Sequence, residues 1–405
     1  MRIKDWWKAH ARLLALLCLL LPVGVAETAP VSCSTPDCFD SAQGHWYKGN
    51  THAHAIMMLH GIVPHGDSSP ASVATWYREH GYDFAVITDH NRFTDPKSPG
   101  LERVQNRDFL MIPGVEITSD YRFPGATQEG ERAIHTTALN VREAPSFDFA
   151  NTPSREILKT HIERTRAAGG ITIVNHPNYH GEIKPEDMLG LEGLRLFEVF
   201  NGEVEAHNDA APGRLSTEQL WDSLLTAGMH VYGVAADDAH YFKLPDFTTH
   251  YRGTFTLPGS GWIMVNAREL SSSAIVDAID QGQFYATTGV ILKQVRYDRQ
   301  HYEISVDWPA THASMASTFV TEAARNAPAN RADGLTIEFI GSGGKVLKTT
   351  HDETAEIDID PSDGYARARI TLVSILKTRL DDEPTAHVFT AWTQPVFSTS
   401  TPPRT

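Results

Sequence analysis

The segment Tyr82-Asp-Phe-Ala-Val-Ile-Thr-Asp-His90 is an apolar run of strand-forming residues that ends in polar side chains. Comparable runs recur along the chain, and segments with helical signals separate them. Ser69-Pro70 opens one predicted helix, Asn151 to Pro153 opens another that ends at Gly169-Gly170, and Ser216 with Gln219 forms a capping box. Such alternation is expected of an α/β barrel or a wound sheet. The seven predicted strands are 46–50, 83–88, 110–117, 134–141, 170–175, 195–200 and 230–236.

The pattern changes near residue 295. A further strand at 262–266 and a helix at 272–281 precede the segment 284–289, and we expect this part to close a first domain over 46–294. From Val295 onward, apolar and polar residues alternate with a period of two, which predicts a small β-sandwich over 295–397. A polar tail is expected at 398–405. No chemical motif occurs after residue 295, so we interpret the second domain as a stabilising or docking appendage.

The first 26 residues have the organisation of a secretory signal. Four basic residues, Arg2, Lys4, Lys8 and Arg12, precede the apolar run 13–21 and the small residues 24–26. This run is short against the ~20 residues that span a bilayer. We therefore expect a secreted or periplasmic protein without a stable membrane span, an uncleaved signal anchor being the alternative. Residues 27–45 would form an N-terminal segment.

The chain is strongly acidic without this signal. Removing its four basic residues and one acidic residue from the totals of 35 and 50 leaves a net charge of −18. An acidic surface without a basic stripe repels long polyanions, which excludes duplex nucleic acid as an expected partner. Small anions held by metal ions remain compatible with this charge.

Two cysteines remain beyond the signal, Cys33 and Cys38. An oxidising compartment favours a local disulfide between them. The alternative is a pair of unpaired thiols in a frayed segment.

Seven histidines and two carboxylates fall at or near the ends of the predicted strands. In Asn50-Thr-His-Ala-His54 the two imidazoles alternate along an extended segment, so they point the same way and can reach one ion. Nitrogen and carboxylate oxygen suit zinc, manganese or iron, and their number implies a cluster of ions. The nine residues are His52, His54, His60, His90, Glu116, His135, His176, Asp238 and His240.

These residues resemble the polymerase and histidinol phosphatase (PHP) superfamily of seven-stranded barrel metalloenzymes, over roughly residues 46–290. The resemblance implies a distorted (β/α)7 TIM-like barrel that holds two to three divalent ions. It implies that His52 and His54 bind a first ion with Asp238, and that Glu116 bridges this ion to a second. His135 and His176 would complete the second site, and His60, His90 and His240 would hold a third.

Three segments resemble the secreted branch of this superfamily that includes carbaryl-hydrolase-like members. They are 47–54, 284–289 and the Ala391-Trp-Thr-Gln-Pro395 ending. One departure is Asp237, which stands where many relatives have a small residue, although the Asp-x-His spacing favours Asp238 as the ligand. His65, His180 and His207 are predicted to be surface histidines on loops.

Neighbouring polar residues are expected to hold the ligands in place, because a metal-bound imidazole usually donates its other N–H to a carboxylate or carbonyl. The candidates are Asp89, Asn91, Asn175 and Asn201.

The expected function is hydrolysis of a small phosphate ester by metal-activated hydroxide, with Glu116, Asp238 and His240 as the catalytic residues. The partner would be a small, anionic substrate. A first alternative is a carbamate, ester or amide hydrolase on the same cluster. A second alternative is a non-catalytic metal-binding surface module, which the number of ligands disfavours because a structural ion needs only four.

Overall fold

A computed structural model gives the fold of the chain. It describes residues 37–59, 63–119, 133–146, 152–243, 257–315, 334–376 and 383–398. The chain divides into two units, 1–32 and 33–405, and every described residue belongs to the second. No helix within these described ranges is long and apolar enough to cross a membrane. The predicted signal (1–26) and most of the tail (399–405) lie outside the described residues, as does Cys33.

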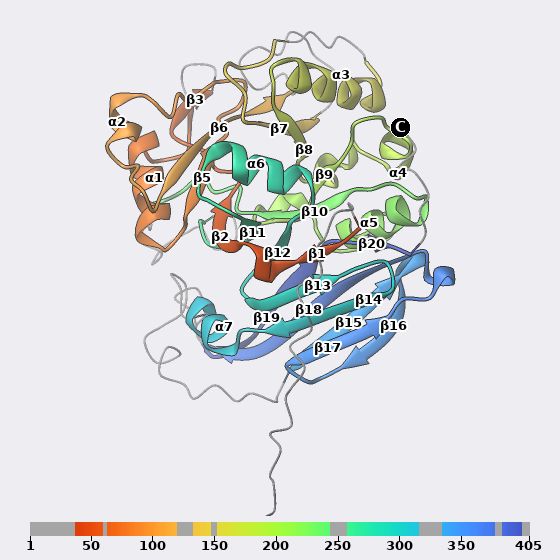
Figure 1. Ribbon diagram of the computed structural model, residues 1–405. Helices are drawn as coiled ribbons and strands as arrows, with labels where there is room; N and C mark the ends of the chain where they lie inside the picture. Colours follow the sequence, from red (N-terminus) through yellow and green to blue (C-terminus); the bar gives the residue numbers. More distant parts are fainter. Residues whose placement is uncertain are drawn as a thin grey trace, which may run out of the picture. The chain divides into compact units, whose positions relative to one another are not determined.

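All seven predicted strands are present, and they lie side by side in chain order within one sheet of a mixed α/β fold (Figure 1). They are β2 (His45–Asn50), β5 (Phe84–Ile87), β6 (Leu110–Thr118), β7 (His135–Leu139), β8 (Ile171–Val174), β9 (Leu196–Asn201) and β10 (Tyr232–Ala236). Their interior faces are apolar, and a core cluster that includes Phe84, Ile112 and Val234 fills the space between them.

Strand β7 departs from a uniform parallel arrangement. It runs antiparallel to both β6 and β8, whereas β2, β5 and β6 are parallel to one another, as are β8, β9 and β10. Because β7 is reversed, its first residue lies at the same edge as the last residues of its neighbours. His135 pairs in register with Thr118, the final residue of β6. The reversal therefore explains how a histidine that begins a strand joins residues that end the others.

The two ends of this strand series meet again just beyond β2 and β10. Ala53 and Ala239 form a parallel bridge. The His54 N–H donates to the Ala239 carbonyl at 2.8 Å, and the Asp238 N–H donates to the His52 carbonyl at 3.0 Å. Within the strands themselves, β2 takes β11 (Trp262–Ala267) as its second neighbour. The bridge brings the metal-ligand candidates of β2 and β10 to one place.

The helices begin where the sequence predicts. The Ser69 hydroxyl accepts the Ser72 N–H at 3.2 Å and caps α1 (Pro70–Glu79), while Ser216 and Gln219 form the capping box of α5 (Thr217–Thr226). These helices lie at the periphery of the strand series in Figure 1. The remaining helices here are α2 (Pro99–Glu102), α3 (Ser154–Ala167), α4 (Pro185–Met188) and α6 (Ser272–Asp280).

A small hairpin also lies beside the strand ends. It consists of β3 (Met57–Leu59) and β4 (Val63–His65), and its register pairs Met57 with His65. Residues 60–62, between the two strands, lie outside the described part of the chain. The hairpin thus carries His65 back toward the segment that contains His54.

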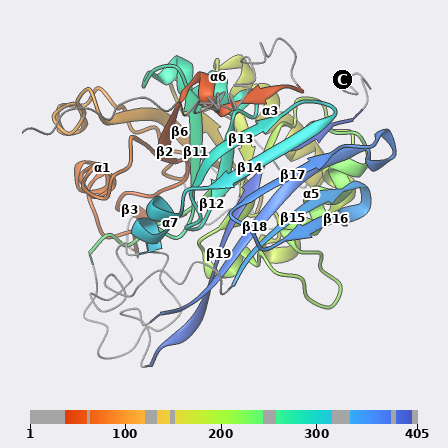
Figure 2. The same ribbon diagram turned by 60° about the horizontal axis from the view of Figure 1, so that its bottom comes forward.

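The strands of the second half extend the large sheet and form another. The large sheet continues from β2 through β11, β12 (Phe284–Thr287), β19 (Thr385–Thr393), β18 (Tyr365–Leu376), β15 (Leu335–Gly341) and β16 (Lys345–Thr350), with β20 (Val396–Phe397) beside β18. The four-stranded sheet contains β1 (Phe39–Asp40), β13 (Leu292–Tyr297), β14 (His301–Val306) and β17 (Thr354–Asp358). Tyr302 and Ile304 from the small sheet share one core with Phe339 and Ile370 from the large sheet. Strands of both sheets are visible in Figure 2.

The helix α7 (Trp308–Met315), after residue 295, was not predicted. Its buried residues are Trp308, Thr311 and Met315, which share one helical face. Pro309 in the first turn is compatible with a helix start. The period-two alternation on either side hid this short helical pattern.

Candidate metal centre

His52 and His54 lie directly after β2 and are fully buried. Their Nε2 atoms are 3.2 Å apart, and the Asp238 Oδ1 atom lies 3.2 Å from His52 Nε2 and 3.1 Å from His54 Nε2. The bridge between Ala53 and Ala239 holds the two segments in this register. The three side chains therefore form one group, as the resemblance implies for the first ion.

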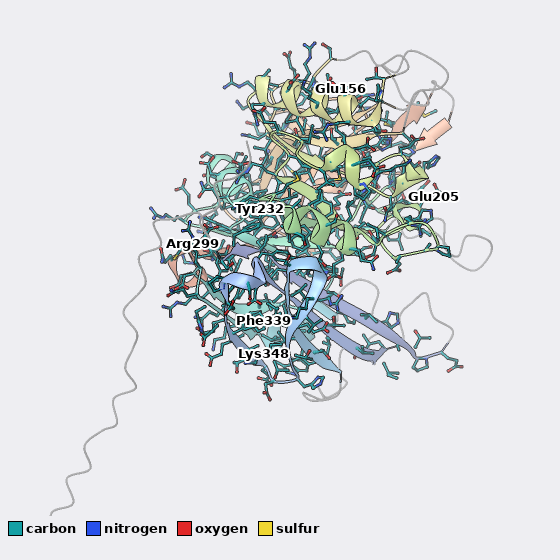
Figure 3. The ribbon with its side chains drawn as sticks, turned by 90° about the vertical axis from the view of Figure 1, so that its right-hand side faces the viewer. Glu156, Glu205, Tyr232, Arg299, Phe339 and Lys348 are labelled. Carbon is teal, nitrogen blue, oxygen red and sulfur yellow. The ribbon has the colours of Figure 1, made fainter. Side chains whose placement is uncertain are left out.

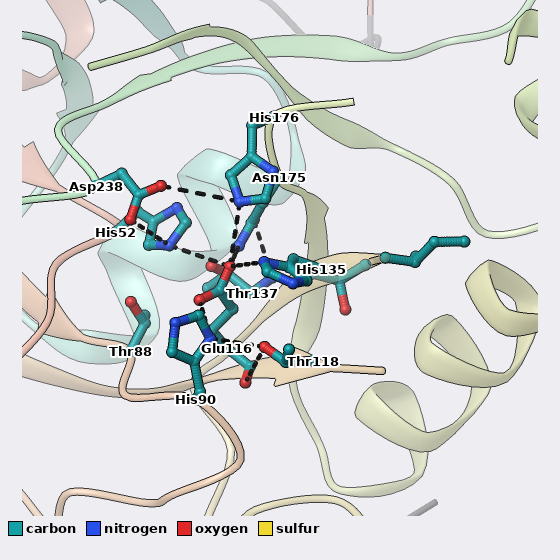
Figure 4. Close-up of polar contacts among 12 residues, drawn as sticks. His52, Thr88, His90, Glu116, Thr118, His135, Thr137, Asn175, His176 and Asp238 are labelled. Atoms are coloured by element: carbon teal, nitrogen blue, oxygen red, sulfur yellow. Dashed lines mark hydrogen bonds and ion pairs between the residues drawn. The ribbon is translucent and has the colours of Figure 1, made fainter. Parts of the chain in front are cut away.

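Glu116, near the end of β6, lies at the middle of the cluster (Figure 4). Its Oε1 atom is 3.3 Å from His52 Nε2, 3.2 Å from His135 Nδ1 and 3.4 Å from His176 Nε2. Its Oε2 atom is 2.7 Å from His90 Nδ1. Burial alone would raise the pKa of Glu116, but His90, His52 and His135 hold it well below its usual value. Glu116 is therefore an ionised carboxylate that several imidazoles share.

The two aspartates after β10 have different surroundings. Asp238 faces the histidines, and its backbone adopts the left-handed conformation (φ 53°) that turns the carboxylate toward them. Asp237 accepts hydrogen bonds from the Tyr77 hydroxyl at 2.8 Å and from the Ser260 and Gly261 N–H groups at 2.7 and 2.9 Å. Burial raises the pKa of Asp237 to about 6. Asp237 thus holds residues 260–261 against the end of β10, whereas Asp238 belongs to the cluster of metal-ligand candidates.

Ligand atoms of the cluster fall into four overlapping groups that can each hold a metal ion, with all atoms of a group within 4.8 Å of one another. The groups are His52, His54 and Asp238; His52, Glu116 and His176; His90, Glu116 and His135; and His54, His65, His90 and His240. Eight of the nine predicted ligands are thereby brought together. The ninth, His60, lies outside the described residues.

His65 was predicted to be a surface histidine, and that prediction is wrong. Its Nε2 atom is 2.7 Å from His240 Nε2 and 3.2 Å from His90 Nε2. Burial lowers the pKa of His65 to about 4, so its imidazole is neutral, as a metal ligand must be. The β3–β4 hairpin, which the sequence did not reveal, delivers this residue. His180 and His207 are exposed, as predicted.

Glu198 was not predicted. It is the single charged residue within the buried strand β9, a signal that the sequence offered. His52 Nδ1 lies 2.8 Å from Glu198 Oε1 and donates its proton there, which leaves His52 Nε2 as a lone pair directed at the cluster. Glu198 Oε2 accepts the His176 N–H at 2.7 Å and so positions a second ligand.

Two of the four predicted supporting residues contact cluster carboxylates. The Asn175 amide donates to Glu116 Oε1 at 2.9 Å. The Asn201 amide donates to Glu198 Oε2 at 2.7 Å and to Asp238 Oδ2 at 3.2 Å. Both amides fix the direction in which a carboxylate presents its remaining lone pairs.

The other two predicted supporting residues, Asn91 and Asp89, bind the backbone next to cluster residues. Asn91 exchanges hydrogen bonds with the backbone of Thr118, whose hydroxyl lies 2.7 Å from His90 Nδ1. Asp89 accepts the Ala55 N–H at 2.8 Å and therefore supports the backbone beside His54. Arg92 Nη2 lies 3.7 Å from Asp89 Oδ2.

The donor set fits metal ions on two observations. First, His52 Nε2 lies 3.2 Å from both His54 Nε2 and Asp238 Oδ1 and 3.3 Å from Glu116 Oε1, a crowding of buried lone pairs that costs free energy unless a cation satisfies them. Second, tetrahedral ligands ~2.0–2.1 Å from a zinc ion are about 3.3 Å apart. The separations among His52, His54 and Asp238 are 3.1 and 3.2 Å. Nitrogen and oxygen donors without sulfur suit zinc, manganese or iron.

No protein-family model and no curated protein matches the chain. Among solved structures, the chain is similar to a two-domain protein from Bacteroides vulgatus that contains a predicted PHP-like metal-dependent phosphoesterase. The two share 16% identity with a TM-score of 0.42, and the match covers 85% of this chain and 96% of that chain. It is also similar to an amidohydrolase from Chromobacterium violaceum with bound sulfate, with 12% identity, a TM-score of 0.31 and coverage of 48% and 87%.

Proposed function

We propose that the protein is a metal-dependent hydrolase that cleaves small phosphate esters with two to three divalent ions, zinc, manganese or iron. The observation that supports this most is the overlap of the four ligand groups, in which His52, His54, His90 and Glu116 each belong to two groups. A structural ion needs one closed shell of four ligands. Shared ligands instead keep several cations close enough to act on one substrate.

The proposal includes the fold and the family that the resemblance implies. Seven consecutive strands and the Ala53–Ala239 bridge support a distorted (β/α)7 barrel over 46–294, and the shared core of two sheets supports a β-sandwich over 295–397. We propose membership of the PHP superfamily on the ligand pattern, with the carbaryl-hydrolase-like branch as the expected relative. Secretion or export to the periplasm is proposed from residues 1–26.

Divalent ions at such a site lower the pKa of a coordinated water toward neutrality and neutralise charge on phosphoryl oxygens. The residues of the chain prepare this chemistry. Glu116 and Asp238 supply the negative charge that offsets closely spaced cations, and Glu198 fixes His52 as the tautomer with a free Nε2. His240 Nδ1 donates to the Asp238 carbonyl at 2.8 Å, which leaves its Nε2 free in the same way.

The third group is proposed to contain His65 beside His90 and His240, and His60, which lies outside the described residues, stays a predicted ligand of this group. His65 and His240 face each other through their Nε2 atoms at 2.7 Å, and His240 cannot donate from that atom when its Nδ1 carries the proton. A cation held by both residues would use the Nε2 lone pair of each, with His65 also carrying its proton on Nδ1. We therefore assign His54, His65, His90 and His240 to one ion.

A substrate panel on metal-reconstituted protein tests the proposed function. Phosphomonoesters or phosphodiesters are expected to be cleaved faster than the matching aryl carboxylic ester and aryl carbamate, because several cations can hold two phosphoryl oxygens at once. The control is the same panel after removal of metal by a chelator, where turnover should disappear and return on reconstitution. Cleavage of the carbamate or ester with both phosphate esters left intact would favour the alternative hydrolase on the same cluster.

A further inference from the structure

Asp67 connects the two segments of the chain that carry His65 and His240. Its carboxylate accepts the Phe242 N–H at 3.0 Å through Oδ1 and the Lys243 N–H at 3.0 Å through Oδ2. The Asp67 N–H also donates to the His240 carbonyl at 3.2 Å, and the Lys243 ammonium group donates to the Asp67 carbonyl at 2.7 Å. Asp67 is thus bound through both its side chain and its backbone to the segment that begins at His240.

Neither segment is held by a long regular element at this point. His65 is the last residue of β4, a strand of three residues, and residues 240–243 belong to no helix or strand. A carboxylate that accepts two consecutive backbone N–H groups fixes the direction of that backbone. The side chain of Asp67 therefore supplies the order that a strand ladder supplies elsewhere in the sheet.

Gly66, between His65 and Asp67, lies where the chain approaches two other segments closely. Its φ is +82°, and a Cβ atom at this position would lie 2.9 Å from the Ala55 carbonyl oxygen and 3.3 Å from the His240 carbonyl oxygen. Two residues further on, the carbonyl of residue 68 accepts the N–H of residue 56 at 2.7 Å. The chain here therefore contacts both the segment after β2 and the segment after β10.

The contacts of Asp67 lie close in sequence to both histidines. Asp67 lies two residues after His65, and its carboxylate binds the backbone two and three residues after His240. The Nε2 atom of His65 is 2.7 Å from His240 Nε2 and 3.2 Å from His90 Nε2. These three histidines and His54 form the proposed third group. Asp67 thus holds together the two segments whose imidazoles meet in this group.

We propose that Asp67 is a positioning residue that sets the affinity of the third group for its metal ion. This inference rests on the proposed function. Asp67 holds the His65 and His240 side chains in place before an ion binds. Without its carboxylate, binding must also order the two segments, and the free-energy cost of that ordering weakens the binding. Loss of a residue that supports metal ligands weakens metal affinity about 10–100-fold.

Asp67→Ala tests the proposal, with Asp298→Ala as the matched control. Asp298 also accepts two backbone N–H groups, those of Gln300 and His301 at 2.8 and 2.9 Å, in the turn between β13 and β14. Each protein is stripped of metal and titrated with manganese against a competing chelator, which gives the dissociation constant of each ion. The thermal midpoint is measured before and after loading, and turnover is measured at limiting and at saturating manganese.

The control residue lies away from the strand ends that carry the cluster. Figure 3 shows Arg299, the residue after Asp298, on the opposite side of the molecule from Glu205. Glu205 belongs to the 3₁₀ turn η3 (Val204–Ala206), which follows β9. Asp298→Ala therefore removes a similar pair of hydrogen bonds without touching the third group.

Asp67→Ala is expected to bind one ion at least about tenfold more weakly than the wild-type protein does, with the other ions unchanged. The rise in thermal midpoint on loading should shrink, because a bound ion stabilises the fold according to its affinity. Turnover should fall at limiting manganese and return at saturating manganese, since every ligand is still present. Asp67→Asn keeps one acceptor oxygen and should bind this ion with intermediate affinity, whereas Asp298→Ala should bind manganese as the wild-type protein does.

A double variant shows whether Asp67 acts through the third group. In His65→Ala a ligand of this group is already absent, so the addition of Asp67→Ala should weaken none of the remaining ions. Unchanged affinities in Asp67→Ala, or an equal weakening of every ion, would overturn the role of Asp67 while leaving the metal centre in place. If the wild-type protein binds at most one ion, the metal centre of the proposed function fails, and the role of Asp67 fails with it.

Discussion

Glu116→Gln is expected to reduce turnover at least about a thousandfold, which corresponds to ~4 kcal/mol of transition-state stabilisation. The side chain keeps its shape in this variant but loses the negative charge that His52, His90, His135 and His176 surround. An amide also cannot bridge two cations as a carboxylate does. We expect the metal content to fall together with turnover, as measured by elemental analysis and steady-state kinetics.

His207→Ala is the control for this prediction. His207 is exposed and follows the turn η3, so its removal is expected to leave the metal content unchanged and to alter substrate affinity at most. If Glu116→Gln keeps both its ions and its turnover, Glu116 does not bridge metal ions.

Arg367→Met is expected to have the largest effect on stability. Arg367 on β18 is fully buried, and its guanidinium group donates to both Asp222 oxygens at 2.9 Å and to Glu218 Oε1 at 2.9 Å. The ring of Trp221 covers it, with the guanidinium carbon 4.8 Å from the ring centroid. Removing the cation leaves two largely buried carboxylates of α5 without their main partner. Such a loss costs about 3–5 kcal/mol, measurable by urea unfolding of the metal-loaded protein.

The pH dependence of this loss has a definite sign. In the wild-type protein, Arg367 and Arg369 outweigh burial and lower the pKa of Glu218, so that part of the stability is lost as the pH falls. In Arg367→Met, burial would raise the carboxyl pKa values above those of the unfolded chain. The difference in free energy of unfolding between the wild-type protein and Arg367→Met should therefore shrink as the pH falls. Arg107→Met, at an exposed arginine paired with Asp108, should change stability by less than ~0.5 kcal/mol at any pH. A deficit in Arg367→Met as small as in this control would contradict the account.

The sequence predicts the strands and most of the site because both depend on local patterns. Most of the seven predicted runs are of strand length and rich in apolar residues, and the segments between them carry turn or helix signals. Alternation within Asn50-Thr-His-Ala-His54 likewise predicts that two imidazoles face one point, and their Nε2 atoms are 3.2 Å apart. The capping serines Ser69 and Ser216 mark their helices for the same local reason.

The features that the sequence did not reveal depend on contacts between distant segments. The direction of β7 follows from its pairing with β6 and β8, which no local pattern encodes. His65 joins the cluster because a hairpin of two three-residue strands returns toward His54, and such short strands leave no periodic signal. Glu198 lies within a buried strand, and its role depends on a hydrogen bond with His52. His52 is 146 positions earlier in the chain, so no local pattern relates the two residues.

The count of tightly bound ions tests the central claim most directly. Wild-type protein, purified without chelator and reconstituted with manganese, zinc or iron, is compared by elemental analysis with His65→Ala, His60→Ala and the exposed-histidine control His207→Ala. We predict more than one transition ion per chain in the wild-type protein, the loss of one ion in His65→Ala and in His60→Ala, and no loss in His207→Ala. At most one tightly bound ion in the wild-type protein after reconstitution would contradict the account. Loss of an ion in His60→Ala but not in His65→Ala would contradict the assignment of His65 to the third group.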